Sequence, residues 1–132
     1  MYSVRALAAE RDTVILHLTK ANPKSGVTVM HLQGSVHCGP DCRRLEDETD
    51  QLIGAKEKFV VIDFAQVTHI DSAAIGTLVR CYSKLKNSGG FLRLSGCTGM
   101  TECSLKMAQL HKVLEMYPNT ASAVENYPPA DS

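Results

Sequence analysis

The sequence contains no tryptophan, few other aromatic residues and no excess of charge of either sign. Aromatic residues make up 5% of the 132 residues, and 14 lysines and arginines balance 14 aspartates and glutamates. A chain without net charge has no long-range field that would gather phosphate backbones. We therefore expect no nucleic acid among its partners.

Long apolar runs are also missing. A membrane-spanning helix needs about 18 consecutive apolar residues, and no stretch of the sequence approaches that length. Residues 1–10 do not join a basic region to a long apolar one, as a secretory signal would. The five cysteines are an odd number spread along the chain, which favours reduced thiols over a disulfide framework. These features predict a cytoplasmic protein without membrane insertion.

Signatures of common catalytic and nucleotide-binding sites are absent as well. Gly89-Gly90 lacks the further glycines and the lysine of a phosphate-binding loop. Ser72 is flanked by Ile70 and Ala74, and not by the two glycines of a Gly-x-Ser-x-Gly nucleophile turn. The histidines show no spacing that groups them as metal ligands. We expect no cofactor, no bound metal and no enzymatic activity.

What is present is the composition of one compact domain. The hydrophobic fraction is 44% and the charged fraction is 21%, as in soluble globular proteins. A chain of this length buries enough surface for one hydrophobic core. We expect the domain at residues 13–126, after an N-terminal extension of residues 1–12 and before a flexible tail of residues 127–132 that contains two prolines.

Hydrophobic periodicity predicts alternating strands and helices. Strands are expected at Thr13–Thr19, Val27–Gln33, Lys58–Phe64, Phe91–Ser95 and Val113–Tyr117. Helices are expected at Pro40–Ile53, from Ser72 to a stop at Ser88-Gly89-Gly90, and at Ala121–Asn126, where Asn119 or Thr120 is the cap. A further helix is expected between the last two strands, with the side chains of Cys103, Met107 and Leu110 directed inward. The turn-rich segment Ala21–Gly26 makes the first two strands a hairpin. This order predicts an α/β fold with a mixed, mostly parallel central sheet of about four to five strands.

The most informative stretch is Val67–Gly76, with the sequence VTHIDSAAIG. It links the predicted central strand to the second helix, at the edge where partners and ligands meet open α/β sheets. Asp71 or Ser72 can cap this helix by accepting a hydrogen bond from an amide of its first turn. Capping alone is a sufficient explanation for the pair. The alternative is that an exposed Ser72 hydroxyl carries a phosphate, which the helix dipole and the free amides would tolerate.

Several blocks resemble the STAS family of anti-sigma factor antagonists in their order and spacing. They are Phe59–Phe64, Val67–Ser72, Ile75-Gly76 and Gly89–Leu94, and Leu110–Tyr117 is similar to the closing segment of the family. The resemblance implies a single STAS-like domain with helices packed mainly on one face of the sheet. It also implies that Ser72, the first serine after the aspartate, is phosphorylated and that binding depends on the phosphate.

The implied partner is an anti-sigma factor with a histidine-kinase-like ATPase fold, which is also the serine kinase, and a serine phosphatase reverses the modification. The protein would be a monomer or weak dimer. Asp71 would shape the turn, Gly76 would allow close packing, and Arg80 with Lys84 would extend the contact. The implied docking surface comprises His37, Asp71, Ser72, Ala73, Ala74, Ile75, Gly76 and Arg80.

Two departures from the family pattern lie on that surface. The usual Asp-Ser-Ser-Gly-Leu-Gly is replaced by Asp-Ser-Ala-Ala-Ile-Gly at Asp71–Gly76, and His37 stands where an acidic loop residue is often found. Alanine in place of glycine at Ala74 adds a methyl group to the expected docking surface and favours the helix by up to about 1 kcal/mol.

Two alternatives stay open. Single STAS domains also resemble accessory subunits that bind the ATPase of an ABC transporter. Cys38 and Cys42, with His37 nearby, suggest a metal or redox site, although their spacing has one residue too many for Cys-x-x-Cys. An enzyme that uses these thiols or Ser72 is the less favoured hypothesis.

Overall fold

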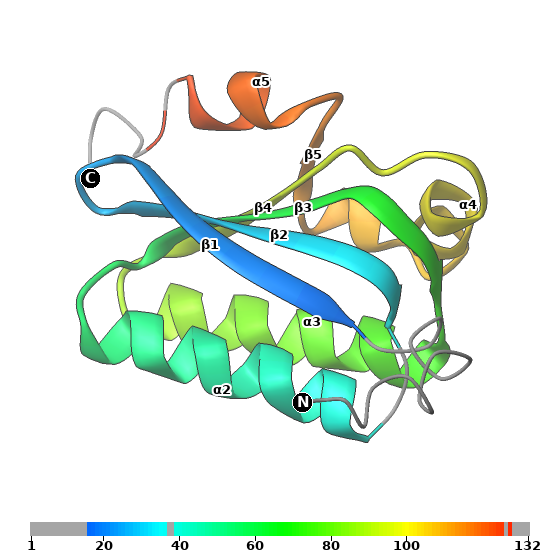
Figure 1. The fold of residues 1–132 in the computed structure, drawn as a ribbon, viewed down its shortest axis with the longest axis horizontal. Helices are drawn as coiled ribbons and strands as arrows, with labels where there is room; N and C mark the ends of the chain where they lie inside the picture. The colour runs from blue at the N-terminus through cyan, green and yellow to red at the C-terminus, as the bar shows by residue number, and fades with distance from the viewer. Residues whose placement is uncertain (1–15, 37–38, 126, 128–132) are drawn as a thin grey trace, which may run out of the picture.

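The computed structural model describes residues 16–36, 39–125 and 127 (Figure 1). Its centre is one five-stranded sheet in the order β1-β2-β3-β4-β5. The first two strands are antiparallel and the other neighbours are parallel, so the predicted mixed sheet is confirmed. The strands are β1 (His17–Lys24), β2 (Val27–Val36), β3 (Phe59–Ile70), β4 (Phe91–Ser95) and β5 (Glu115–Tyr117).

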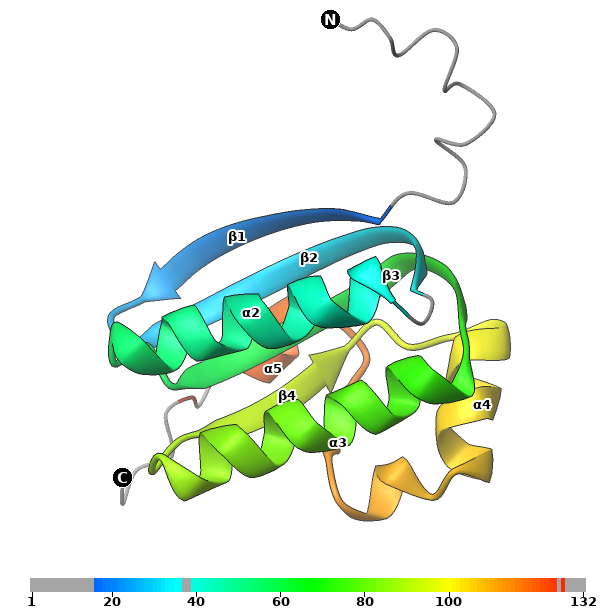
Figure 2. The ribbon, with the colours of Figure 1, turned by 90° about the horizontal axis from the view of Figure 1, so that it is seen from below.

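Helices cover the two faces of the sheet unequally. They are α2 (Pro40–Gly54), α3 (Ser72–Asn87), α4 (Gly99–Met107) and α5 (Thr120–Val124), with a 3-10 turn η2 at Leu110–Lys112. Figure 1 shows α2 and α3 below the sheet and α5 above it, and Figure 2, seen from below, shows α2 and α3 side by side in front of the sheet. The prediction that helices pack mainly on one face is therefore confirmed. No helix in the described ranges is both long and apolar enough to cross a membrane.

The alternation of side chains across the strands creates two cores. The larger core joins α2, α3 and the segment from α4 to β5 to the lower face of the sheet, through residues such as Leu45, Leu78 and Leu105. The smaller core lies under α5 and contains Val61 and Tyr127. Because strand side chains point alternately up and down, each central strand supplies apolar residues to both cores.

The first strand runs further than the sequence predicts. Residues 13–15 lie outside the described part of the chain, but β1 continues to Lys24, through the expected turn. Asn22-Pro23 falls at an irregularity of the register between Ala21 and Lys24. Proline is tolerated here because β1 is an edge strand, whose outer amides need no partner.

The third strand is also longer than predicted. It continues from Phe64 to Ile70, so the first four residues of the Val67–Gly76 motif belong to the strand. This extension pairs with the end of β2, where Val36 lies opposite Ile70. Two register shifts accommodate the extra residues of β3.

The segment after β4 also differs from the prediction. Met107, predicted inward, is 80% exposed, whereas Leu105 and Leu110 are buried. The α4 helix ends after Met107, and the left-handed backbone at Gln109 redirects the chain into η2. The side chain of Cys103 lies outside the described residues. The last strand begins at Glu115 and not at Val113.

Tyr127 corrects the predicted limit of the domain. We expected it in a flexible tail, but its side chain is 1% exposed and its hydroxyl donates to the Val60 carbonyl oxygen at 3.3 Å. The guanidinium of Arg93 lies 4.0 Å from the centre of its ring and donates to the Ala123 carbonyl oxygen. These contacts hold α5 on the upper face of the sheet.

Candidate functional site

The pairing of β2 with β3 fixes the start of α3. The amide of Asp71 donates to the Val36 carbonyl oxygen at 3.2 Å, directly after the last residue of β3. The Asp71 carboxylate then accepts a hydrogen bond from the Ala74 amide at 2.8 Å. Asp71 is therefore the N-cap, and Ser72 is the first residue of the helix. This settles which of the two residues caps the helix.

Capping by Asp71 leaves Ser72 at the surface. Ser72 is exposed, and none of the hydrogen bonds among the described residues involves its hydroxyl. Ala73 is exposed next to it, and Ile75 is half-buried against the larger core. The predicted surface residues around Ser72 thus lie together at the first turn of α3, where free amides and the positive end of the helix dipole favour an anion.

Ala74 is placed differently from our expectation. Its side chain is 1% exposed and belongs to the larger core. The methyl group that distinguishes this chain from the family pattern therefore packs inward, because position 74 faces the sheet. Ala74 contributes no surface for docking, and the substitution acts on the core and on the propensity of the helix.

Gly76 has open space where a side chain would project. A Cβ atom built at this position would meet only the Arg80 Nη1 atom, at 3.9 Å, which is an ordinary contact. Glycine inside a helix is unfavourable by about 0.5–1 kcal/mol relative to alanine. Close packing among the described residues does not explain this glycine, which is half-buried one turn after Ser72 and Ala73.

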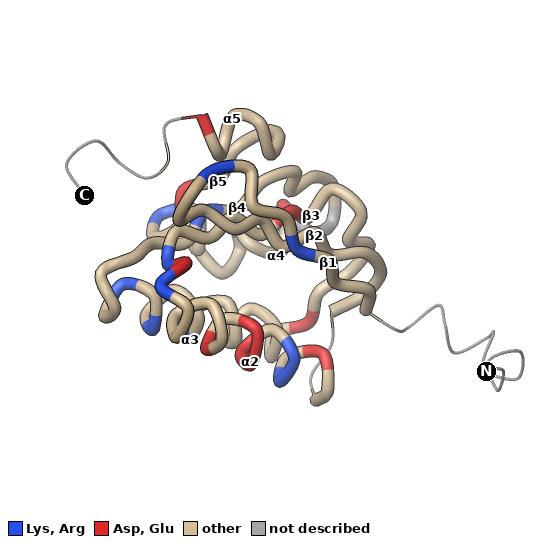
Figure 3. The backbone as a smooth tube through the Cα atoms, turned by 60° about the vertical axis from the view of Figure 1, so that its left-hand side comes forward, with Lys and Arg blue, Asp and Glu red and all other residues tan. Residues whose placement is uncertain are grey.

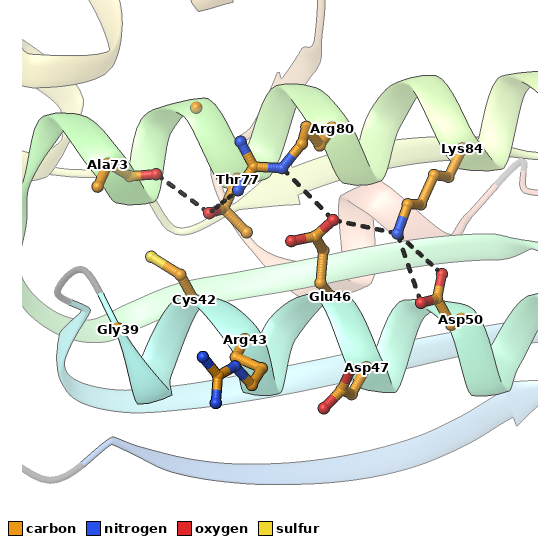
Figure 4. Close-up of a pocket in the computed structure, with 11 residues that line it drawn as sticks. Gly39, Cys42, Arg43, Glu46, Asp47, Asp50, Ala73, Thr77, Arg80 and Lys84 are labelled. Atoms are coloured by element: carbon orange, nitrogen blue, oxygen red, sulfur yellow. Dashed lines mark hydrogen bonds and ion pairs between the residues drawn. The ribbon is translucent and has the colours of Figure 1, made fainter.

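A groove of about 480 Å³ between α2 and α3 adjoins this surface (Figure 4). Ala73, Gly76 and Thr77 form part of its α3 wall, and Gly39, Cys42 and Arg43 form part of its α2 wall. Further along, the walls carry charges of opposite sign. The groove therefore continues the Ser72 surface between the two helices.

Four charged residues link the groove walls. Lys84 Nζ lies 3.0 Å from a Glu46 carboxylate oxygen and 3.1 Å from one of Asp50. Arg80 Nε lies 3.4 Å from the same oxygen of Glu46, and the Arg80 Nη2 atom donates to Thr77 Oγ1 at 3.0 Å. The acidic members come from α2 and the basic members from α3, as Figure 4 shows. Outside this network, α2 carries charges of both signs (Figure 3).

The network shifts the pKa values of its members. Hydrogen bonding from Lys84 lowers the pKa of Glu46, burial opposes this effect, and the hydrogen bond from Arg80 adds to the lowering. Hydrogen bonding to Glu46 and then to Asp50 raises the pKa of Lys84. Of this network, the sequence pattern predicted only the basic half, Arg80 and Lys84. The missed signal is a pair of acidic residues four apart on one helix and a pair of basic residues four apart on the next.

The cysteine hypothesis gains no support from the described residues. His37 and Cys38 lie outside them, and Cys42 is buried. No group of three or more His, Cys, Asp or Glu side chains that could hold a metal ion occurs in the described ranges. Burial raises the pKa of the Cys97 thiol to about 12, which disfavours the reactive thiolate.

Among the described residues, one histidine pairs with a carboxylate, and this pair makes no hydrogen bond to Ser72. Its members are His31 and Asp63, whose Nδ1 and Oδ2 atoms lie 2.7 Å apart on β2 and β3. They line a separate cavity of about 240 Å³ together with His17 and Gln66. Nucleophilic catalysis needs a base within hydrogen-bond reach of the hydroxyl, and this pair does not supply one to Ser72.

The fold and the site define a small α/β domain with one mixed sheet, helices mainly on one face and an exposed serine at the start of α3. The model of the STAS domain family matches residues 19–123, and the chain belongs to this family. Comparison with curated proteins gives no match.

Three solved structures illustrate the likeness of fold. A Thermotoga maritima protein assigned as an anti-sigma factor antagonist has a TM-score of 0.75 at 17% identity, over 83% of this chain and 92% of that chain. An anti-sigma factor antagonist from Mycobacterium paratuberculosis has a TM-score of 0.72 at 20% identity, over 84% and 92%. The phosphorylated form of the Bacillus cell fate determinant SpoIIAA has a TM-score of 0.67 at 13% identity, over 83% and 98%.

Proposed function

We propose that this protein is an anti-sigma factor antagonist whose binding is controlled by phosphorylation of Ser72. The observation that carries the proposal is the exposed Ser72 hydroxyl directly after the Asp71 cap, in a chain of the STAS family. Structural neighbours named as anti-sigma factor antagonists support the same general function. The activity is regulatory protein binding and not catalysis by this chain.

The partner is an anti-sigma factor with a kinase-like ATPase fold, acting in the cytoplasm. It transfers the γ-phosphoryl group of ATP to Ser72 Oγ, and ADP and the hydroxyl proton are released. A phosphatase hydrolyses the phosphoester and restores the serine. SpoIIAA, one of the structural neighbours, has been solved in both phosphorylated and unphosphorylated forms.

The position of Ser72 on the first turn of α3 supports a switch by one phosphate. The phosphate adds about −1.5 to −2 charges and three acceptor oxygens to the first turn of α3. The helix dipole stabilises these charges, so the domain stays folded. A partner that docks over Ser72 and Ala73 must instead desolvate the phosphate, which opposes binding.

Affinity capture from the source cells tests this function. Tagged wild type, Ser72→Ala, Ser72→Glu and Ser83→Glu are compared, and the retained proteins are identified by mass spectrometry. Ser83 is also exposed on α3, so its substitution controls for charge alone. We expect a kinase-like ATPase to be retained by all variants except Ser72→Glu. Equal retention by Ser72→Glu, or the absence of such an ATPase from every sample, would contradict the proposal.

An accessory subunit of an ABC transporter remains the alternative prediction, and no specific feature of the described residues favours it. In the same experiment it predicts that a transporter ATPase is captured by all four proteins. The two functions are thus separated by the identity of the captured ATPase and by its dependence on Ser72.

A further inference from the structure

The guanidinium of Arg80 reaches back along α3 toward Ser72. Its Nη1 atom lies 3.9 Å from the position of a Cβ at Gly76, one helical turn before Arg80. Side chains in helices point toward the N-terminus, which accounts for this direction. Figure 4 shows the Arg80 side chain directed to Thr77, toward the start of the helix.

Gly76 leaves the path between Arg80 and Ser72 open. Ser72, Gly76 and Arg80 follow one another at intervals of four residues, so neighbouring members share a helix face at Cβ separations of about 5–6 Å. Any side chain at position 76 would lie between the other two. With glycine there, the Arg80 guanidinium stands one turn from Ser72 with no side chain in between.

Two contacts hold the Arg80 guanidinium in its present position. Its Nη2 atom donates to Thr77 Oγ1 at 3.0 Å, and Thr77 keeps its own hydrogen bond to the Ala73 carbonyl oxygen if Arg80 moves. The contact with Glu46 is the weaker one. The Arg80 side chain is 56% exposed, and its Nε atom lies 3.4 Å from Glu46, longer than a strong charge-assisted hydrogen bond. Glu46 has a closer partner in Lys84, at 3.0 Å. Arg80 can therefore leave Glu46 without leaving that carboxylate unpaired.

We propose that a phosphate on Ser72 draws the Arg80 guanidinium across Gly76 and away from Glu46, so that phosphorylation rearranges the groove between α2 and α3. This inference rests on the proposed modification of Ser72 and adds its structural consequence. A phosphate offers Arg80 a doubly charged, bidentate partner in place of a single carboxylate oxygen. The exchange frees one side of Glu46 and changes the charge that a partner meets in the groove.

The neighbouring charges favour this exchange. In the groove, Glu46 pairs with Arg80 and Lys84, and Asp50 pairs with Lys84. Arg43 and Asp47 of α2 also line it. The acidic neighbour of Ser72 in the sequence is Asp71, whose Oδ1 accepts a hydrogen bond from the Ala74 amide. Arg80 is the cation of α3 whose side chain lies nearest to the phosphate along the open path.

Phosphorus NMR of purified protein with genetically encoded phosphoserine at position 72 tests the contact without any kinase or partner. A nearby guanidinium stabilises the doubly charged phosphate and lowers its second pKa. We expect Arg80→Gln to raise that pKa by roughly 0.2–0.7 units, the range of an exposed ion pair. Lys86→Gln, which removes an exposed charge from the last turn of α3, should leave it within about 0.1 units.

A second measurement follows Arg80 itself. Its Nε–Hε cross-peak in a nitrogen–proton NMR spectrum should shift between the serine and phosphoserine proteins, while backbone spectra confirm that both are folded. Superimposable phosphate titrations of the Arg80→Gln and parent phosphoproteins, with an unshifted cross-peak, would overturn the inference. Because the phosphate is installed directly, this result is independent of whether a cellular kinase modifies Ser72.

Discussion

The Asp71 carboxylate accepts a hydrogen bond from the Ala74 amide at 2.8 Å, and this contact sets the first turn of α3. Because Asp71 performs the capping, the hydroxyl of Ser72 is left for another role. The proposed switch depends on these separate roles: Asp71 caps the helix, and Ser72 is available for phosphorylation.

Substitution of Asp71 should therefore destabilise the domain more than substitution of Ser72. Asp71→Ala removes the cap and is expected to lower the free energy of unfolding by about 1 kcal/mol, within a range of roughly 0.5–2. Asp71→Asn keeps an acceptor oxygen and should lose less. Urea denaturation of these variants and of Ser72→Ala measures the difference. A Ser72→Ala loss as large as that of Asp71→Ala would show that the cap is misassigned.

Gly76→Ala should stabilise the isolated domain while weakening the partner complex. Among the described residues, the added methyl meets the Arg80 side chain alone, at 3.9 Å, and it removes the unfavourable helix propensity of glycine. The expected gain is about 0.5–1 kcal/mol in the free energy of unfolding. If binding to the captured ATPase is unchanged in the same variant, Gly76 is not part of the docking surface.

Tyr127 should behave as a core residue and not as part of a tail. Tyr127→Ala removes a ring that is packed on Arg93 and Phe59, and should cost about 3–5 kcal/mol. Tyr127→Phe keeps the ring and loses only the hydrogen bond to the Val60 carbonyl oxygen, for about 0.5–1.5 kcal/mol. Thermal or urea denaturation compares the two variants. Equal stability of the alanine variant and wild type would show that Tyr127 belongs to the tail and not to the core.

Periodicity predicted the order of elements because most strands and helices carry a regular apolar pattern, as in Phe91–Ser95 and α3. It could not place Tyr127, a single aromatic residue without a periodic neighbourhood. It also could not foresee that Arg93, between two inward leucines, is covered by α5 and only 5% exposed. Such burial depends on partners distant in sequence, Glu115 and Ala123.

The site was predictable to a similar degree. An Asp-Ser pair before an apolar helix indicated the N-terminus of α3. Which of the two residues is the N-cap could be decided only from the backbone geometry at Asp71. The inward placement of Ala74 follows from the rotation of α3 over the sheet, which the residue types near Ser72 do not reveal. The link between Arg80 and Glu46 required the two helices to be side by side.

The groove network should make stability depend on pH through Glu46. Its pKa in the folded protein lies below the ordinary value of 4.5, so ionised Glu46 stabilises the fold at neutral pH. This contribution is lost as the pH falls from 4.5, the ordinary pKa, to the lower pKa of Glu46 in the folded protein. We expect Glu46→Gln to be less stable than wild type by up to about 1 kcal/mol at neutral pH.

Urea denaturation at pH 7 and at about pH 3 measures this difference. The gap between wild type and Glu46→Gln should narrow at the lower pH, where Glu46 begins to protonate. Glu125→Gln, which replaces an exposed carboxylate outside the groove, serves as the control. A gap that is equal at both pH values would mean that the ion pairs of Glu46 with Lys84 and Arg80 contribute nothing to stability.

The most direct test of the switch is the affinity of the captured ATPase for this protein with serine or with phosphoserine at position 72, both purified and confirmed as folded. Calorimetry or surface-based binding measures the two dissociation constants at the same salt concentration. We predict that the phosphate weakens binding by about tenfold or more, because its charge must be desolvated at the docking surface. Equal dissociation constants for the two forms would contradict the account.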